Sequence, residues 1–133
     1  MTRSRTRIHR AEGTYPLDAY AHAVLVDRTL YVSGQVPLDE AERTVGVGDV
    51  RAQAERVFQN LAAVLRAVRA DMTDVVKVTT YLVDMRDVPI VREVRQRAFG
   101  AAKAALTTVA VASLLRPEFR ITIDAIAELD DGA

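Results

Sequence analysis

The sequence predicts an α+β fold in which two helices cover one face of a mixed sheet, with the element order β-β-α-β-α-β-β. Three observations support this prediction. Residues 50–69 and 88–99 carry apolar side chains at three- and four-residue spacing, as amphipathic helices do. Five other segments are rich in β-branched and aromatic residues, which favour strands. Two amphipathic helices and one apolar sheet face pack most economically when both helices lie on the same side.

The N-terminal part of the chain predicts a hairpin. Residues 1–13 lack a strong period, so we expect a frayed tail or an edge strand around Thr6–Arg10. Tyr20–Val26 alternates like a strand, and Thr29–Gln35 returns as the next one. A two-residue turn at Asp27 joins them, because Asp tolerates the left-handed backbone of such turns.

Both helices have recognisable ends. Asp49 is a suitable N-cap for the helix over residues 50–69. Asp87 is expected to cap the helix over residues 88–99, and Gly100 is a good stop signal. The arginines of that second helix are interpreted as a solvated face rather than a phosphate site; they are Arg92, Arg95 and Arg97.

The remaining strands are predicted at Val75–Val83, Leu106–Ser113 and Phe119–Glu128. Val75–Val83 is apolar on both faces, which is typical of a central strand. The sheet face away from the helices would be too apolar to meet water, and exposed patches of that kind usually mark an interface. The pattern therefore predicts an oligomer.

Composition narrows the possible functions. A chain of 133 residues is expected to form one domain spanning 1–133. Zero cysteines and two histidines argue against a metal site or a thiol nucleophile. Basic and acidic residues number 18 each, so nucleic acid is an improbable partner. No apolar run is long enough for a membrane span. A cytoplasmic protein without a cofactor is the default expectation.

Several segments, in the same order, resemble the RidA/YjgF family of imine and enamine deaminases, also described as the endoribonuclease L-PSP family. The resemblance covers roughly residues 15–128 and ends in the stretch from Lys103 to Glu128. Its motifs are Tyr20-Ala21-His22-Ala23-Val24, Val32-Ser33-Gly34-Gln35-Val36-Pro37-Leu38, Asp74-Val75-Val76-Lys77-Val78-Thr79, Asp84-Met85 and Ala125-Ile126-Ala127. These are mostly core and turn residues, so they specify the fold better than the chemistry.

The resemblance implies a chorismate-mutase-like fold assembled as a homotrimer, with the sheets forming a central barrel and clefts between subunits. In the deaminating members, an arginine in the cleft holds the substrate carboxylate. A glutamate on the last strand, with a bound water, helps to hydrolyse a 2-imino acid to a 2-oxo acid and ammonia. The resemblance thus implies a small-molecule ligand in each cleft and no cofactor.

The family's site maps onto this chain with two departures. Its arginine falls on Leu106, and its first glutamate falls on Thr122. Its second glutamate falls on Asp124. The remaining positions match residue types that the family uses near the cleft, namely Tyr20, Gly34, Gln35, Thr107 and Thr108.

These positions yield the candidate site residues. Thr107 and Asp124 are the candidate catalytic residues. The candidate substrate-binding residues are Tyr20, Gly34, Gln35, Leu106, Thr108, Arg120 and Thr122. Arg120 is included because it shares a strand face with Asp124 in a two-residue period and could replace the missing arginine. The alternative is an exposed Arg120–Asp124 ion pair of little energetic value.

Similar alternatives apply elsewhere in the site. Tyr20 could simply pack on a strand, and the two threonines could be ordinary strand formers. His22 is more readily explained as a half-buried structural residue than as a general base.

Three functions fit the sequence. The first is an enzyme acting on an imine, an enamine or a related intermediate, with weak or lost deamination of 2-imino acids and a specialised place in secondary metabolism. The second is a non-catalytic small-molecule binder or regulator that uses the same clefts. The third is a ribonuclease, which zero net charge and the absence of interleaved aromatic and basic residues disfavour.

Overall fold

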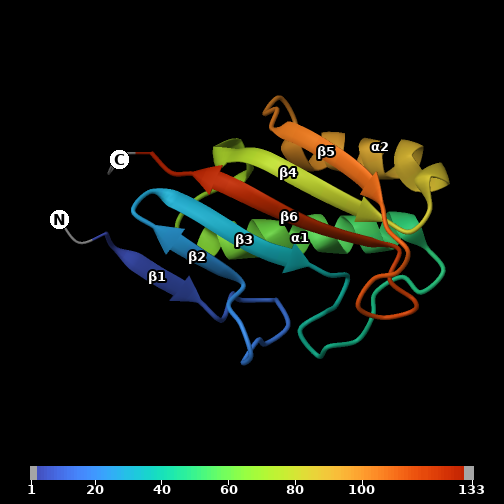
Figure 1. The fold of residues 1–133 in the computed structure, drawn as a ribbon, viewed down its shortest axis with the longest axis horizontal. Helices are drawn as coiled ribbons and strands as arrows, with labels where there is room; N and C mark the ends of the chain where they lie inside the picture. Colours follow the sequence, from blue (N-terminus) through green and yellow to red (C-terminus); the bar gives the residue numbers. More distant parts are fainter. Residues whose placement is uncertain (1–2, 131–133) are drawn as a thin grey trace.

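The computed structural model describes residues 3–130, which form a six-stranded sheet with both helices on one face (Figure 1). The strands are β1 (Arg5–Ile8), β2 (Ala23–Val26), β3 (Thr29–Gln35), β4 (Val75–Leu82), β5 (Ala105–Ala110) and β6 (Ile121–Glu128). Their order across the sheet is β1-β2-β3-β6-β4-β5. Neighbouring strands are antiparallel except β4 and β5, which run parallel. The predicted α+β class and mixed sheet are confirmed.

The N-terminal region agrees with its prediction except at the start of the second strand. The edge-strand alternative for the first residues is correct, because β1 pairs with β2. Strand β2 begins at Ala23 rather than Tyr20. Alternation would place Tyr20 and His22 on one face, but Tyr20 is 46% exposed and His22 is completely buried. The turn is confirmed, since Asp27 adopts a φ of 53°.

Helix α1 (Val50–Ala67) begins as predicted, with the Asp49 carboxylate accepting a hydrogen bond of 3.1 Å from the Ala52 amide. Helix α2 (Val88–Phe99) has the predicted bounds and ends at Gly100, whose φ is 59°. The expected cap at Asp87 is wrong, because its side chain makes no capping hydrogen bond. That carboxylate binds Arg120 instead. Residues 3–130 also contain two short 3-10 helices, η1 (Met72–Asp74) and η2 (Met85–Asp87).

The hydrophobic core lies between the helices and the sheet. Leu61 and Leu65 of α1 are fully buried. They belong to the same cluster as Leu30 of β3 and Ile121 and Ile123 of β6. Burying one such side chain contributes about 1.5–3 kcal/mol, so this cluster fixes α1 on the sheet. No helix within residues 3–130 combines the length and apolar character that crossing a bilayer would require.

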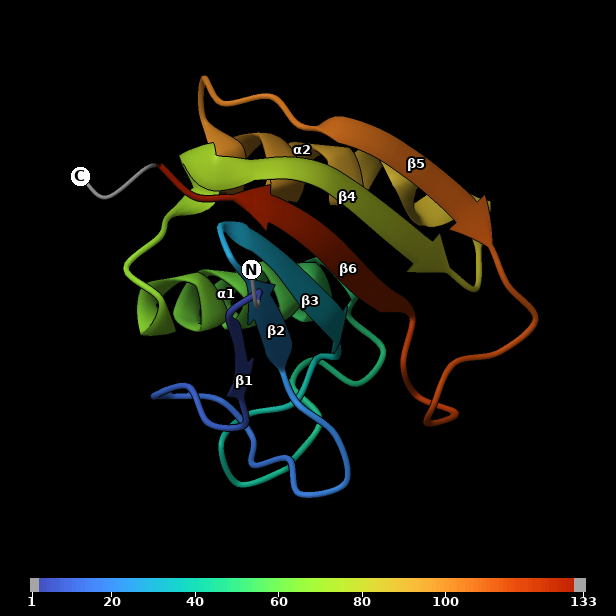
Figure 2. The ribbon, with the colours of Figure 1, turned by 60° about the vertical axis from the view of Figure 1, so that its left-hand side comes forward.

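The last two strands are separated in space, although they follow one another in sequence. Strand β6 lies between β3 and β4, and β5 lies on the far side of β4, at the sheet edge (Figure 2). The central position predicted for β4 is confirmed. Strand β5 is shorter than predicted, because the chain leaves the sheet after the Val111 amide donates to the Leu82 carbonyl.

We call the sheet face turned away from the helices the open face. Along β6, buried residues alternate with partly exposed ones, and the partly exposed ones belong to this face. Tyr31 and Val109 are among its exposed apolar residues. It also carries polar side chains, including Lys77 and Asp124. The open face is therefore mixed rather than purely apolar.

Candidate functional site

The predicted site residues do not form one site within a single chain. Gly34 is the second-last residue of β3, Thr122 is the second residue of β6, and Leu106 to Thr108 lie on β5. The residues fall into two groups: across the sheet, β3 is three strand spacings from β5 and β6 is two, which are about 14 Å and about 10 Å. We call them the β3–β6 group and the β5 group.

In the β3–β6 group, Gly34 and Thr122 are in close contact. A Cβ placed on Gly34 would lie 3.0 Å from the Thr122 Cγ2 atom, so a larger residue at position 34 would push against β6. Two residues further along β6, the Asp124 carboxylate accepts a hydrogen bond of 2.9 Å from the Tyr81 hydroxyl. That carboxylate raises the pKa of Tyr81, which keeps the phenol protonated and donating.

In the β5 group, successive side chains point to opposite faces of the sheet. Leu106 pairs with Val78 of the core face and shares a cavity with it, on the side of α2. Thr108 lies two residues after Leu106, so its side chain points to the same face of the sheet as Leu106. Thr107 points to the open face, where its hydroxyl accepts a hydrogen bond of 2.6 Å from the Lys77 ammonium. The two threonines therefore serve different surfaces.

Arg120 lies one residue before β6, and its guanidinium is directed to Asp87 rather than to Asp124. It makes a bidentate contact, with Nε and Nη2 both 2.8–3.0 Å from the Asp87 carboxylate oxygens. The Asp87 side chain is only 9% exposed. The exposed Arg120–Asp124 pair is thus not found, and the guanidinium already has a carboxylate partner at the start of α2.

Gln35 is fully buried and belongs to a polar network with His22 and Tyr15. Its amide nitrogen donates to His22 Nδ1 at 3.3 Å, and its amide oxygen accepts from the Tyr15 hydroxyl at 3.3 Å. His22 Nε2 donates to the Tyr15 carbonyl at 2.8 Å. We call these three residues the interior network. In one chain, Gln35 supports the fold rather than facing a ligand.

Burial sets the protonation states of the interior network. Desolvation lowers the pKa of His22, because the charged imidazolium loses its contact with water. Desolvation also raises the pKa of Tyr15 to about 12. The imidazole is therefore neutral, with the proton on Nε2 and the lone pair of Nδ1 facing Gln35. This arrangement confirms His22 as a structural residue.

Tyr20 differs from the interior network, although it lies close to it in sequence. Its ring is in the segment before β2 and is 46% exposed. Within the described part of the chain, its hydroxyl has no hydrogen-bond partner. Tyr20 is therefore available to a ligand or to another subunit.

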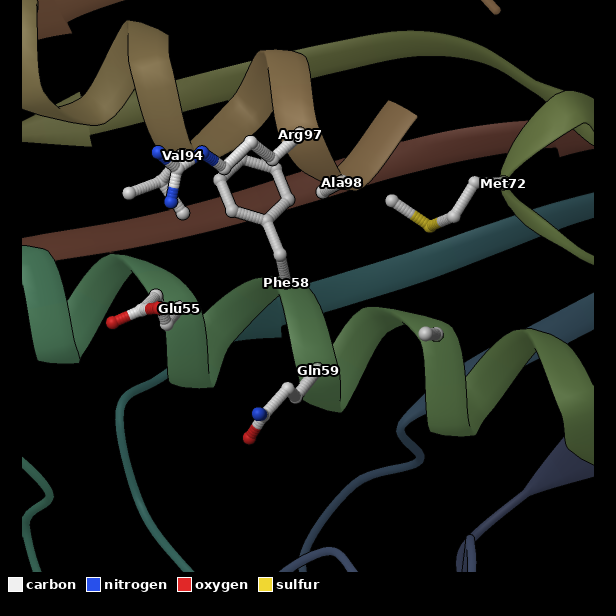
Figure 3. Close-up of a pocket in the computed structure, with 8 residues that line it drawn as sticks. Glu55, Phe58, Gln59, Met72, Val94, Arg97 and Ala98 are labelled. Atoms are coloured by element: carbon white, nitrogen blue, oxygen red, sulfur yellow. The ribbon is translucent and has the colours of Figure 1, made fainter. Parts of the chain in front are cut away.

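Two hollows lie beside α2. The first, of about 310 Å³, separates α1 from α2, with Phe58, Val94, Ala98 and Met72 as its apolar lining and Arg97 at its edge (Figure 3). None of the residues predicted for the site lines it. Within the described residues, no group of three or more His, Cys, Asp or Glu side chains could hold a metal ion.

The second hollow, of about 290 Å³, lies between α2 and β5, and we call it the α2–β5 hollow. Leu106 lines it together with Arg95 and Phe99 of α2. Sequence reasoning missed Arg95 because it treated the helix arginines alike. The sequence separates Arg95 only from Arg97, which has Glu93 four residues before it, whereas Val91 stands four residues before Arg95.

The comparisons with known proteins agree with this fold. Residues 11–129 match a family model described as Endoribonuclease L-PSP. The chain is 43% identical over 126 residues to a Myxococcus xanthus protein named DfrA, with 93% of this chain and 95% of the relative covered. It is 37% identical to the 2-iminobutanoate/2-iminopropanoate deaminase of Rattus norvegicus, with 92% and 89% covered. The crystal structure of RidA from an Antarctic Psychrobacter superposes with a TM-score of 0.85 at 30% identity, with 93% and 99% covered.

Proposed function

The chain belongs to the RidA/YjgF family, whose model is described as Endoribonuclease L-PSP, and has its chorismate-mutase-like α+β fold. From this premise we propose that it binds and acts on a small imine, enamine or related intermediate in clefts between subunits. Its hydrolysis of 2-imino acids is weak or absent. One observation carries this proposal: Leu106 occupies the position at which the family resemblance implies a carboxylate-binding arginine.

The chemical consequence follows from the missing charge. In imine hydrolysis, water adds to the carbon of the C=N bond and ammonia leaves, while the substrate carboxylate must be held in place. A bidentate contact with an arginine contributes about 1.5–3 kcal/mol. Leu106 is 41% exposed and offers only apolar contact at this position. Thr122 likewise replaces the family's first glutamate, so the carboxylate expected to assist the water is absent there.

A homotrimer is part of this proposal. Tyr20, Gly34 and Thr122 lie on one side of the sheet order, and Leu106 and Thr108 lie at the β5 edge. Subunits that place the first group against the β5 edge of a neighbour would complete a cleft that one chain lacks. The open face would then line the central barrel. A cytoplasmic location and a role in a secondary-metabolic pathway belong to the same proposal.

The test compares hydrolysis of 2-iminobutanoate and 2-iminopropanoate by the natural protein and by Leu106→Arg. We expect rates near background for the natural protein and a gain of about tenfold to a hundredfold in kcat/KM for Leu106→Arg, because the guanidinium restores the carboxylate contact. Leu106→Met is the matched control and should leave the rate unchanged. A natural rate well above background that also survives Thr107→Ala would overturn the proposal.

The two departures from the family's site, Leu106 and Thr122, also favour a second candidate, a non-catalytic binder or regulator. A metabolite that raises the melting temperature without being consumed would identify this function. Ribonuclease activity is less well supported, because the net charge is zero and phosphate contacts require a basic excess. RNA binding that weakens steeply with salt would reverse that ranking.

A further inference from the structure

The α2–β5 hollow has an apolar wall and a basic rim. Phe99 of α2, Val78 of β4 and Leu106 of β5 supply the apolar surface. Arg95 and Gln96 of α2 and Lys103 of the segment after it supply the polar groups. Figure 1 shows α2 running behind β4 and β5, and residues 100–104 connect the helix to β5. Side chains from two strands, a helix and a connection therefore meet in one place.

The charge of this hollow is not neutralised by the protein. No Asp or Glu lines it. Within residues 3–130, neither Arg95 nor Lys103 makes an ion pair, whereas Arg97 of α2 and Arg120 beside it do. Arg97 contacts Glu93 at 3.2 Å, and Arg120 contacts Asp87 at 2.8 Å. Arg95 and Lys103 thus differ from these two arginines, and they differ from Arg92, which is exposed and lies outside the hollow.

Arg95 is also partly removed from water, being half-buried against its own helix and the hollow. Desolvation lowers its pKa, and the nearby Arg92 charge adds to that effect. Guanidinium groups placed in such surroundings usually have a carboxylate or phosphate partner, because an unpaired charge loses hydration without compensation. The missing partner here would be an anion supplied from outside the chain.

We propose that the α2–β5 hollow binds a small carboxylate with an apolar tail, its head group held by Arg95 and Lys103 and its tail against Phe99 and Leu106. The planar guanidinium can hold a carboxylate through two parallel hydrogen bonds, and the Lys103 ammonium adds a second positive charge. Leu106 then contributes to binding, because it supplies apolar surface for the tail of the ligand. This site shares Leu106 with the cleft of the proposed function, but it does not depend on whether the chain hydrolyses imines.

The test uses phenylacetate and its uncharged analogue phenylacetamide as probes of the full chain. Binding is measured by calorimetry and located by amide chemical-shift changes. We expect phenylacetate to bind about tenfold or more tightly than phenylacetamide. Its shift changes should centre on Arg95, Phe99 and Leu106 rather than on Gly34 and Thr122. Raising the salt concentration should weaken phenylacetate binding and leave phenylacetamide binding unchanged.

Two variants and one control separate this site from general electrostatics. Arg95→Gln should lose about tenfold in phenylacetate affinity, and Lys103→Gln should lose a smaller factor. Lys103 is exposed, so its variant reports on binding even if Arg95→Gln folds poorly. Arg97→Gln changes the net charge equally, lies two residues away and outside the hollow, and should retain full affinity.

Three results would overturn the proposal. One is equal binding of the acid and the amide. Another is unchanged phenylacetate affinity in both Arg95→Gln and Lys103→Gln, or an equal loss in Arg97→Gln. The last is a set of shift changes centred on Gly34 and Thr122. Failure of the imine assay alone would leave this binding site standing, because no step in its argument uses catalysis.

Discussion

The interior network and the α2–β5 hollow are both built from polar side chains beside the sheet, but they treat those side chains in opposite ways. In the interior network, every side-chain nitrogen and oxygen of Tyr15, His22 and Gln35 has a protein partner. Around the hollow, Arg95 and Lys103 have no ion-pair partner within residues 3–130. Close by on β4, the buried Thr80 hydroxyl has no hydrogen-bond partner in the structure.

This difference separates a structural role from a binding role. A polar group that the protein satisfies internally stabilises the fold and has little capacity left for a ligand. A polar group without a partner costs stability and gains most when a ligand arrives. The resemblance to the family pointed to Gln35 as a ligand contact, but its bonds within one chain are complete. In the part of the chain that the structure describes, the groups without a partner are Arg95, Lys103 and Thr80, and they lie near the β5 edge of the sheet.

The largest expected effect comes from breaking the interior network with Gln35→Leu. This change removes the donor to His22 Nδ1 and the acceptor for the Tyr15 hydroxyl, both in a fully buried setting. We expect a loss of about 2–4 kcal/mol in the free energy of unfolding, measured by urea denaturation. Gln59→Leu, at an exposed position of α1, is the control and should change stability by less than about 0.5 kcal/mol. Equal losses in Gln35→Leu and Gln59→Leu would show that the interior network does not stabilise the fold.

A smaller effect should appear in the pH dependence of stability. Burial lowers the pKa of His22 in the folded state below its ordinary value of 6.5. Between these two pKa values the unfolded chain binds more protons than the folded chain, so acidification below about pH 6.5 should destabilise the protein. The free energy of unfolding, measured from pH 7.5 to 5.0, should fall less steeply in His22→Asn. Gln59→Leu, which alters no titratable group, should keep the natural slope.

The smallest effect should come from Thr80→Val, and it should be stabilising. Val has nearly the same shape as Thr and removes a buried hydroxyl that has no partner. We expect a gain of about 0.5–1 kcal/mol in the free energy of unfolding, measured by thermal and urea denaturation. Thr108→Val, at the half-buried position that pairs with Thr80 on β5, should produce a smaller change. A loss of stability in Thr80→Val would show that its hydroxyl has a partner in solution.

Local signals in the sequence predicted the helices well. The Asp49 cap and the Gly100 stop are properties of a few neighbouring residues, so the sequence contains them directly. The Asp87 cap failed because a distant residue, Arg120, competes for the same carboxylate. The separation of β5 from β6 was also beyond local signals, since strand pairing depends on partners far apart in the chain.

In the candidate site, too, features set by neighbouring residues could be predicted and features set by distant residues could not. Leu106 and Thr107 lie on opposite faces of the sheet, as the two-residue period of any strand requires. That period could not show that Gln35 is enclosed, because that depends on how the segment containing Tyr15 folds over β3. Arg95 was grouped with a solvated helix face, since its half-buried position becomes visible only when β5 and residues 100–104 are in place.

The Asp87–Arg120 contact has a consequence for the chain between these residues. It joins positions 33 residues apart and so closes a loop that begins at the start of α2 and ends at the start of β6. Apart from Val78, all the residues that line the α2–β5 hollow lie inside this loop. Almost all of the hollow is therefore formed by a segment whose two ends are held together by this ion pair. The ion pair restricts the conformations of the whole segment. Loosening this one ion pair would remove that restriction, whereas β5 would stay paired with β4 and Val91 of α2 would stay in the core.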